Sequence, residues 1–589
     1  MLAESLVTSI VKQSARMFLH TPQILRRAIV WSCLFVPLLD SPLIAAPPDA
    51  GQILREQQPQ RQLPERTVQP EQERPKVVRP YGSGVKVTIR AYRFTGYGAL
   101  AQESELQSLV AGTIGKELSD GELNGVLARV DAFLKKKGWF LAQSYLPEQD
   151  VTSGIIEIRL AQGVSDGRMT FNRNKAVRLC TGVLAGLGKD AVQSGQAINE
   201  RKLERALLLM NDLPEVSANA VLVKGSEPGS TGVVVDVSEG PLLSGAAWED
   251  NFGNYYTGRW RSSAMVNVND PSGCGDQLSF IGTISDGLRQ GRVAYTYPIG
   301  SSGLKGNLVY SPMRYEMRRE MSVLDVRGDG QTLDAGLSYP LVRSRLSNVT
   351  ATAGYERKLL SDSMLGIKIS DKTINSCTIG LKGYFFDRLL GGGYNSWNAS
   401  VTTGSVDERI ADLSLSGIPG GFVHANFGLG RLQKIAGPVD LNLSWAAQFS
   451  PGNLDSGEKF YLGGPYGVRA YPVGEAPGDA GQLMNVDLRL KLPVPSEYGT
   501  VQLSGFYDAG RITTHMNPWA YSLLTATGEN NYWLQGAGIE LVYLYNNRLS
   551  LKGSWAHVIG DNPGRNWWGL NSEGKSDKDR FWLVATLYF

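Results

Sequence analysis

Residues 484–492 read Met-Asn-Val-Asp-Leu-Arg-Leu-Lys-Leu, so apolar and polar side chains alternate without interruption. Residues 441–449 keep the same period, with apolar side chains at every odd position. A period of two gives a β-strand one apolar and one polar face. Between the two stretches lies a glycine-rich loop, 460–472, whose single arginine is Arg469. Two amphipathic strands joined through a cationic loop indicate a membrane β-barrel that holds part of this loop in its lumen.

Similar alternation continues from residue 241 to residue 589, where about sixteen strand-like segments can be placed, an even number as in bacterial barrels. Short connections such as 300–303 alternate with long ones such as 316–327, 359–373 and 450–479. Short turns on one side and long loops on the other are typical of outer-membrane barrels, whereas a soluble β-sandwich does not sort its loops in this way. We therefore predict an all-β, antiparallel transmembrane barrel over residues 241–589.

The last predicted strand ends on an aromatic residue, Phe589. Phe581, Leu583 and Leu587 share its face, and Trp582 lies on the other. An amphipathic strand of this kind is similar to the assembly signal of outer-membrane proteins, so we expect the barrel-assembly machinery to insert the chain. Trp and Tyr near strand ends are expected to form the interfacial girdle.

The N-terminal segment predicts a secretory signal peptide over residues 1–46. Arg26 and Arg27 precede an apolar run, 28–39, and small residues follow at Ala45-Ala46. This arrangement implies that the mature protein lies outside the cytoplasm.

Residues 47–82 are rich in Pro, Gln, Arg and Glu and are predicted to be a linker that builds no core. One part of it, 49–58, is a good helix former with Asp49 as the N-cap candidate, and Pro59 ends it. A short helix on a long tether is compatible with a movable plug, and a frayed tail is the alternative.

Residues 83–240 show mixed helical and strand periodicity that repeats once. We predict two β-α-α-β-β modules, 83–163 and 164–240, so that α+β modules precede the barrel. Ser119 and Glu122 form a capping-box pair at the start of the longer helix of the first module. Each module is expected to leave a sheet edge open for pairing.

Several function classes are excluded by composition and motifs. The net charge is +3, from 59 basic and 56 acidic residues, and so small an excess of positive charge does not indicate a nucleic-acid-binding protein. Cys180, Cys274 and Cys377 are far apart in sequence, so we interpret them as incidental buried thiols without a disulfide or zinc pattern. Residues 163–167 match Gly-x-Ser-x-Gly, but they lie in the joint between the modules, without the strand, helix and histidine of a nucleophile elbow. No phosphate-binding loop occurs, and we expect no catalytic site, metal or cofactor.

The candidate functional residue is Arg469. Strand parity places Phe506 and Asp508 on the lumenal face, because a charge facing lipid costs about 2–4 kcal/mol at mid-bilayer. A bidentate pair between Arg469 and Asp508 is expected to pin the long loop inside the barrel. Exchange of the two charges is then expected to restore part of the activity that Arg469→Ala loses.

With these features in place, the chain resembles the outer-membrane transporters of two-partner secretion systems. These are the haemolysin secretion/activation proteins of the ShlB/FhaC/HecB type, often called TpsB. The resemblance covers a signal, a plug-like helix, a linker, two POTRA modules and a sixteen-stranded barrel. Six motifs carry it: Phe94-Thr95-Gly96, Tyr145-Leu146-Pro147-Glu148-Gln149, Asp250-Asn251-Phe252-Gly253, Asn269-Asp270-Pro271-Ser272-Gly273 with Gly275-Asp276, Val468-Arg469-Ala470-Tyr471 and Phe506-Tyr507-Asp508.

The resemblance implies a pore that exports an unfolded exoprotein across the outer membrane of a Gram-negative bacterium, by type Vb secretion. The periplasmic POTRA modules would capture this partner, a TpsA-type adhesin, haemolysin or related β-helical protein, by β-augmentation. Activation of the partner is an additional role that stays open. An assembly or insertase component of the same superfamily is the alternative, although such proteins usually carry more POTRA modules. Because no nucleotide motif occurs, folding of the partner outside would have to drive transport.

The resemblance also implies roles for residues around the arginine and in the first module. Ala470 stands where the family normally has glycine, so either this position is not left-handed or the loop tip shifts. The implied residues are Gly463, Gly464, Val468 and Tyr471 in the loop, Phe506 on the lumenal strand, and Tyr145, Leu146, Pro147 and Gln149 as a substrate-capture motif in POTRA 1.

Overall fold

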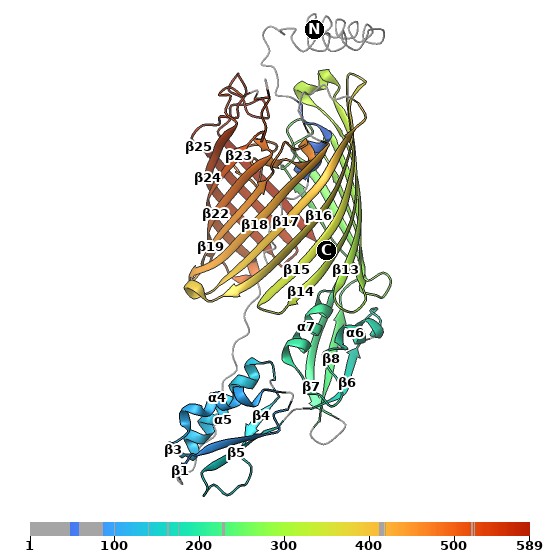
Figure 1. The fold of residues 1–589 in the computed structure, drawn as a ribbon. Coiled ribbons are helices and arrows are strands. Elements are labelled where there is room, and N and C mark those ends of the chain that lie inside the picture. The colour runs from blue at the N-terminus through green and yellow to red at the C-terminus, as the bar shows by residue number, and fades with distance from the viewer. Residues whose placement is uncertain are drawn as a thin grey trace, which may run out of the picture.

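A computed structural model describes residues 47–57 and 86–589, except for 99, 140, 162–163, 175, 226–229, 411–417, 419, 520–521 and 524. The expected signal peptide and most of the expected linker lie outside these residues. The described chain forms a closed barrel of sixteen strands with two small α/β modules at one end (Figure 1). The predicted fold class is therefore confirmed.

Barrel strands pair antiparallel with their neighbours in the chain, and the last strand closes on the first. The closing seam is short, with five residue pairs from Val584–Asp250 to Tyr588–Ala246. The strands are β9 Leu243–Asp250, β10 Arg261–Asn269, β11 Gln277–Ile284, β12 Leu288–Ile299, β13 Leu304–Glu316, β14 Arg327–Arg343, β15 Ser347–Met364, β16 Ile367–Asp387, β17 Gly393–Glu408, β18 Gly421–Ala436, β19 Val439–Phe449, β22 Ala480–Leu492, β23 Thr500–Thr513, β24 Asn531–Tyr545, β25 Leu549–Ile559 and β26 Asp579–Tyr588.

One predicted long loop is wrong. Residues 359–373 mostly continue β15 and β16, which are joined by a tight turn at Leu365 and Gly366. Charged residues in and beside this stretch, namely Lys358, Asp362 and Lys372, have buried side chains. They line a lumen that is filled by other parts of the chain, so their polarity does not mark solvent exposure.

The outer wall of the barrel is apolar. Ile379, Leu488 and Phe581 are each more than half exposed there, as expected for side chains that face lipid. Phe589 exchanges backbone hydrogen bonds of 2.9 and 3.0 Å with Gly245, which fixes the C-terminus against the first strand. Among the described residues, the helices are too short or too polar to cross a membrane.

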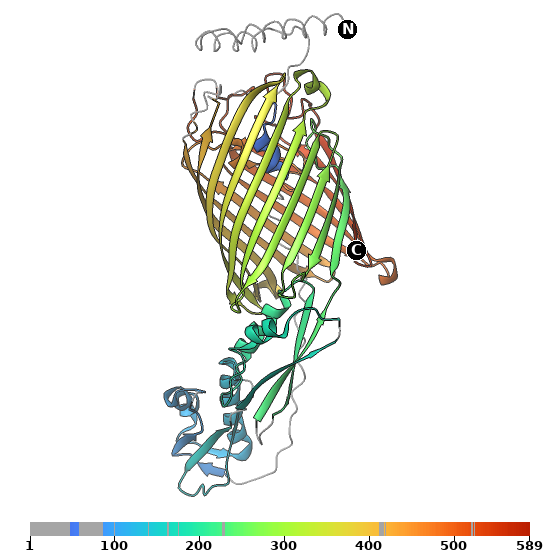
Figure 2. The same ribbon diagram turned by 90° about the vertical axis from the view of Figure 1, so that its right-hand side faces the viewer.

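The two modules repeat one topology (Figure 2). In each, the last strand lies at the centre of a three-stranded sheet, parallel to one neighbour and antiparallel to the other. Ser119 and Glu122 form the predicted capping box at the start of α5. Module 1 contains β1 Lys86–Thr88, β2 Ala91–Thr95, α4 Glu103–Val110, β3 Glu117–Ser119, α5 Asp120–Lys136, β4 Gln143–Tyr145 and β5 Ile155–Ala161; module 2 contains β6 Val164–Arg173, α6 Thr181–Gly188, α7 Glu200–Asn211, β7 Val216–Lys224 and β8 Ser230–Glu239.

The Gly-x-Ser-x-Gly string does not form a nucleophile elbow. Ser165 lies inside strand β6, which runs on past Gly167 to Arg173. The Ser165 hydroxyl accepts a hydrogen bond from the Gly167 N–H at 3.0 Å. The strand bulges between Ser165 and Met169, with Gly167 at a φ of +77°, but it continues as a strand, so no strand-to-helix turn presents the hydroxyl.

Module 2 is fixed to the barrel by a polar joint. Arg343, at the end of β14, forms a bidentate ion pair with Asp212 at 2.7 and 2.8 Å. Lys305 donates to the Asp212 carbonyl at 2.6 Å, and Arg205 donates to the Pro340 carbonyl at 2.8 Å. Three cations thus hold the end of α7 against the barrel turns.

The interpretation of the cysteines as buried is wrong. Cys180 and Cys377 are exposed, and Cys274 is partly exposed. Cys377 lies on the outer face of β16, whereas Cys180 precedes α6 and Cys274 lies in the first barrel turn.

Candidate functional site

The candidate site lies inside the barrel, where loop 450–479 and a short helix, α3 (Ala50–Gln57), fill the lumen (Figure 1). The loop carries Arg469, and the helix precedes the segment that was predicted to be a linker. Contacts between the two elements and the barrel wall define the site.

Arg469 is bound to three strands of the wall at once. Its Nε and Nη2 atoms donate to the two carboxylate oxygens of Asp508 on β23, at 2.9 and 2.8 Å. Nη2 also donates to Asp487 on β22 at 2.7 Å, and Nη1 lies 3.5 Å from Glu540 on β24. The guanidinium carbon stands 3.4 Å from the ring centroid of Phe506, in cation–π contact.

This cluster is buried and balanced in charge. Asp508 is fully buried and Arg469 is 7% exposed, so an unpaired charge here would be costly. Arg489 lies 3.7 Å from Asp487, and Lys552 lies 2.9 Å from Glu540. Three cations therefore face three carboxylates.

The backbone of the loop is bound to the same wall. The Arg469 N–H donates to Asp508 at 3.0 Å, and the Arg469 carbonyl accepts from the Trp582 indole at 2.7 Å. Since Trp582 lies on the last strand, β26, the loop tip also contacts the closing seam of the barrel.

The glycines of the loop motif permit a tight fold. Gly464 adopts a φ of +116° and donates its N–H to the Tyr471 carbonyl at 3.1 Å. A Cβ atom at Gly463 would lie 2.2 Å from the Pro472 carbonyl oxygen. Val468 and Tyr471 are buried in an apolar cluster beside these glycines.

Ala470 is not in the left-handed region, which resolves the question that its departure from the family pattern raised. Its side chain is 3% exposed and faces Gly536 on β24, where a Cβ atom would lie 2.6 Å from the Ala470 Cβ. The methyl group of Ala470 therefore occupies space that a glycine at position 536 leaves free.

We expect Gly536→Ala to displace the loop, because the two Cβ atoms could not both keep their positions. Overpacking of this kind costs typically about 1–3 kcal/mol, so thermal stability of the folded barrel and export should both fall. Combining it with Ala470→Gly should recover most of both losses. Failure of the double variant to recover would contradict the assigned contact.

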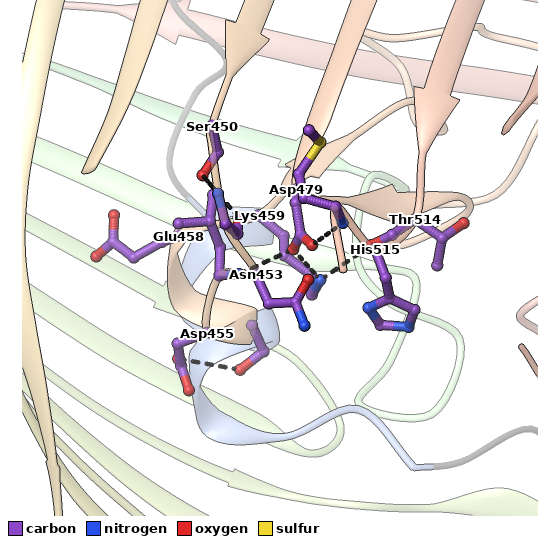
Figure 3. A network of polar contacts seen from close by, with 12 residues as sticks. Ser450, Asn453, Asp455, Glu458, Lys459, Asp479, Thr514 and His515 are labelled. Carbon is purple, nitrogen blue, oxygen red and sulfur yellow. Dashed lines mark hydrogen bonds and ion pairs between the residues drawn. The ribbon is translucent and has the colours of Figure 1, made fainter. Parts of the chain in front are cut away.

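The base of the loop is closed by Asp479 (Figure 3). Its buried carboxylate accepts from the Leu454 N–H at 3.0 Å and the Met516 N–H at 2.9 Å, and it pairs with Lys459. Burial and the nearby Lys459 lower the pKa of His515, in the adjoining loop, to about 4, so this ring is neutral at pH 7. One carboxylate thus ties together both ends of the loop and the loop that follows β23.

A second group of ion pairs anchors the loop on the opposite wall. Glu458 pairs with Lys358 of β15 at 2.6 Å and lies 3.2 Å from His424 Nε2 of β18. Asp455 pairs with Lys372 of β16 at 2.7 Å. Loop 450–479 therefore bridges the lumen from β15, β16 and β18 to β22, β23 and β24.

Helix α3 is bound to both the wall and the loop. Asp49 caps it by accepting from the Gln52 N–H at 2.8 Å, as predicted for this residue. The other Asp49 oxygen accepts from Lys372 at 3.0 Å and from Ser456 at 2.6 Å. At the first turn, the Ala50 N–H donates to Asp362 at 2.9 Å.

The apolar face of α3 completes a hydrophobic cluster within the lumen. Ala50, Ile53 and Leu54 are buried against barrel and loop side chains, including Tyr315 and Leu454. Docking of the helix removes the apolar surface of this face from water, and this burial stabilises the docked position.

The far end of α3 is polar. Glu56 accepts from Asn254 at 3.1 Å, and Gln57 accepts from Arg261 at 2.7 Å. Burial raises the pKa of Glu56 to about 7, against the opposing hydrogen bonds from Gln52 and Asn254. The helix therefore carries a carboxyl group that titrates near neutral pH.

The predicted capture motif in module 1 lies on the edge strand β4 and the segment after it. Tyr145 is 42% exposed, whereas Leu146 packs against the module core. The Gln149 amide is used within the module, because it donates to the Glu157 carbonyl at 2.8 Å and accepts from the Glu157 N–H at 2.6 Å. Pro147 is partly buried.

Sequence reasoning missed most of the lumenal partners. Five are charged residues at inward positions of barrel strands, which the parity of charges on amphipathic strands could have found, and the other three lie in loop 450–479, where no parity applies. The missed partners are Asp487, Glu540, Lys358, Lys372, Asp362, Glu458, Asp455 and Asp479.

Comparison with known proteins gives concordant matches. The sequence model of the family described as haemolysin secretion/activation protein ShlB/FhaC/HecB matches residues 229–531. The model of the ShlB-type POTRA domain matches residues 87–163.

Similar proteins cover nearly the whole chain. The heme/hemopexin transporter protein HuxB of Haemophilus influenzae is 25% identical over 550 residues, which are 91% of this chain and 94% of the relative. The outer membrane transporter CdiB of Escherichia coli is 23% identical and covers 69% of this chain and 70% of its own. The solved structure of CdiB from Escherichia coli superimposes with a TM-score of 0.70 at 20% identity, covering 89% of this chain and 93% of that one.

Proposed function

Because the chain belongs to the haemolysin secretion/activation protein family, we propose that α3 and loop 450–479 close a pore that opens to export an unfolded partner protein. The protein is an outer-membrane transporter of two-partner secretion. Its barrel lies in the outer membrane, and its POTRA modules lie in the periplasm.

The observation that carries the proposed closure is the sharing of Lys372 between the helix and the loop. Lys372 pairs with Asp49 of the helix cap and with Asp455 of the loop, and it is 4% exposed. Departure of either element takes away one of the two carboxylates that pair with this buried ammonium group, and loss of pairing at a buried charge is costly. The resting pore is therefore held shut by one connected network.

The proposed transport path runs from the modules through the lumen. An extended chain cannot pass while α3 and loop 450–479 occupy the lumen, so at least the helix must leave. Helix α3 is a removable element because it is short and has no strand pairing with the barrel. Folding of the partner outside the cell supplies the direction of transport.

We propose that module 1 captures the partner at a sheet edge. Among the described residues, strands β2 and β4 each pair only with β5, so both are edges of this sheet. On β4 the Ser144 N–H donates to Asp131 at 2.7 Å, and a partner strand would have to displace this carboxylate. Tyr145 stands exposed on β4 and is the member of the predicted motif best placed to contact a partner strand. Gln149 instead fixes the conformation of the segment after β4 through its two hydrogen bonds to the Glu157 backbone.

The partner is proposed to be a secreted exoprotein rich in β-structure, such as an adhesin or haemolysin. One relative is named for heme/hemopexin transport, so a partner that handles haem fits the same architecture. Insertion of the barrel itself would use the barrel-assembly machinery, through the amphipathic strand that ends at Phe589.

Deletion of residues 85–162 tests this function. Module 1 has its own hydrophobic core, so the barrel is expected to insert without it, while export of the partner falls below detection. Partner in the culture medium and heat-modifiable gel mobility of the barrel measure the two effects. Normal export by the deletion variant would refute the proposal, and Tyr145→Ala should show a partial loss.

A further inference from the structure

Two cysteines meet at the joint between module 2 and the barrel. Cys180 immediately precedes α6, and Cys274 lies in the turn that joins β10 to β11. The Cys180 N–H donates to the Gly273 carbonyl at 2.8 Å, so the two segments run side by side. A Cβ atom built on Gly273 would lie 3.4 Å from the Cys180 sulfur.

This hydrogen bond bounds the distance between the cysteines. Because the bond joins Cys180 to the residue before Cys274, standard bond lengths limit their Cα separation to about 7 Å at most. Disulfides form without backbone movement up to about this separation. Both thiols are free in the structure, and the Cys274 sulfur lies 3.9 Å from the Ser272 carbonyl, so it must leave this contact to reach Cys180.

Ion pairs between module 2 and the barrel hold the two cysteine-bearing segments next to each other. Arg178, two residues before Cys180, pairs with Glu239 and also reaches the Asn269 carbonyl at 3.5 Å. Asp212 binds Arg343 from the other side of the module. Both thiols remain accessible, since Cys180 is exposed and Cys274 is partly exposed.

We propose that Cys180 and Cys274 form a disulfide that fastens module 2 to the barrel. The periplasm is an oxidising compartment in which such bonds form and persist. The oxidant is a periplasmic disulfide-bearing thiol oxidoreductase, and one cysteine thiolate attacks its disulfide to give a mixed disulfide. The second thiolate then displaces the oxidoreductase, which leaves as a dithiol with the two electrons, while the protein gains one S–S bond.

The consequence concerns motion during export. With the bond in place, module 2 cannot separate from the first barrel turn, so any large movement of the periplasmic part falls to module 1. Module 2 then acts as a fixed mouth of the pore.

Alkylation and mass spectrometry of the full chain test the proposal. Outer membranes are denatured in the presence of an alkylating agent, so that free thiols are blocked before any exchange. Digestion should yield a peptide pair joined through Cys180 and Cys274, with Cys377 alkylated as the internal control. Alkylation of both Cys180 and Cys274, in cells that oxidise another periplasmic protein, would overturn it.

Gel mobility of serine variants provides the second measurement. The wild type and Cys377→Ser should run faster without reductant than with it, because the bond closes a loop from residue 180 to residue 274. Cys180→Ser and Cys274→Ser should show no such difference. The same mobility in all four proteins, with and without reductant, would also overturn the proposal.

Discussion

Replacement of Arg469 with alanine is expected to reduce export of the partner by at least about tenfold while the barrel still inserts. The substitution leaves Asp508, Asp487 and Glu540 close together and buried, with only Arg489 and Lys552 to balance them. Breaking a buried ion pair from one side costs about 3–5 kcal/mol. The loop tip should therefore leave its wall, although the strands keep their own pairing.

Partner protein in the culture medium is the readout, with heat-modifiable gel mobility as the measure of barrel folding. Arg511→Ala is the matched control, because Arg511 lies on the same strand as Asp508 but is exposed. Arg469→Lys should give an intermediate loss, since lysine keeps the charge without the bidentate geometry. Undiminished export by the Arg469→Ala variant would show that the ion pairs of Arg469 are not needed for export.

The structure changes one expectation about this pair. Partial recovery of export was expected from exchange of the charges, Arg469→Asp with Asp508→Arg. That expectation assumed that the site consists of these two residues alone. Position 469 is also surrounded by Asp487 and Glu540, and Asp508 accepts from the Arg469 N–H as well. An aspartate there would join two further carboxylates, so we now expect no recovery.

Strand parity was enough to predict one partner of Arg469 but not the others. Alternation on 501–510 puts Asp508 in the lumen, and this follows from the cost of a charge facing lipid. Which inward charges become neighbours depends on the register between strands, which places Asp508 opposite Asn485 and Asp487 opposite Phe506. Alternation along one strand does not give this register, which depends on the turn between β22 and β23 and on closure of the whole barrel.

The second anchor escaped prediction for a different reason. The prediction took 359–373 as a long loop, so the inward charges of Asp362 and Lys372 were not placed on strands and no contact was assigned to them. Here the contact is with α3 and loop 450–479, which come from distant parts of the chain. A water-filled lumen would also have inward charges, but here other parts of the chain take the place of water as their partners.

Lys372→Ala is expected to open the pore, with an open probability in planar bilayers at least about tenfold above wild type. The substitution leaves Asp49 of the helix and Asp455 of the loop without their shared cation. Lys368→Ala is the matched control, because Lys368 lies on the same strand but is exposed and pairs only with Asp371 near the tip of the hairpin. Unchanged conductance would show that the shared lysine is not needed to keep the pore shut.

Deletion of residues 50–57 separates the two closing elements. If the helix is the main obstacle, the deletion and Lys372→Ala should reach similar conductance, because Arg469 keeps the loop on the other wall in both. A further rise when Arg469→Ala is added to the deletion would assign the remaining block to the loop. The shared lysine then links the two elements. When the helix leaves, Lys372 and Ser456 both lose Asp49; when the loop moves, Lys372 loses Asp455 and Asp49 loses Ser456.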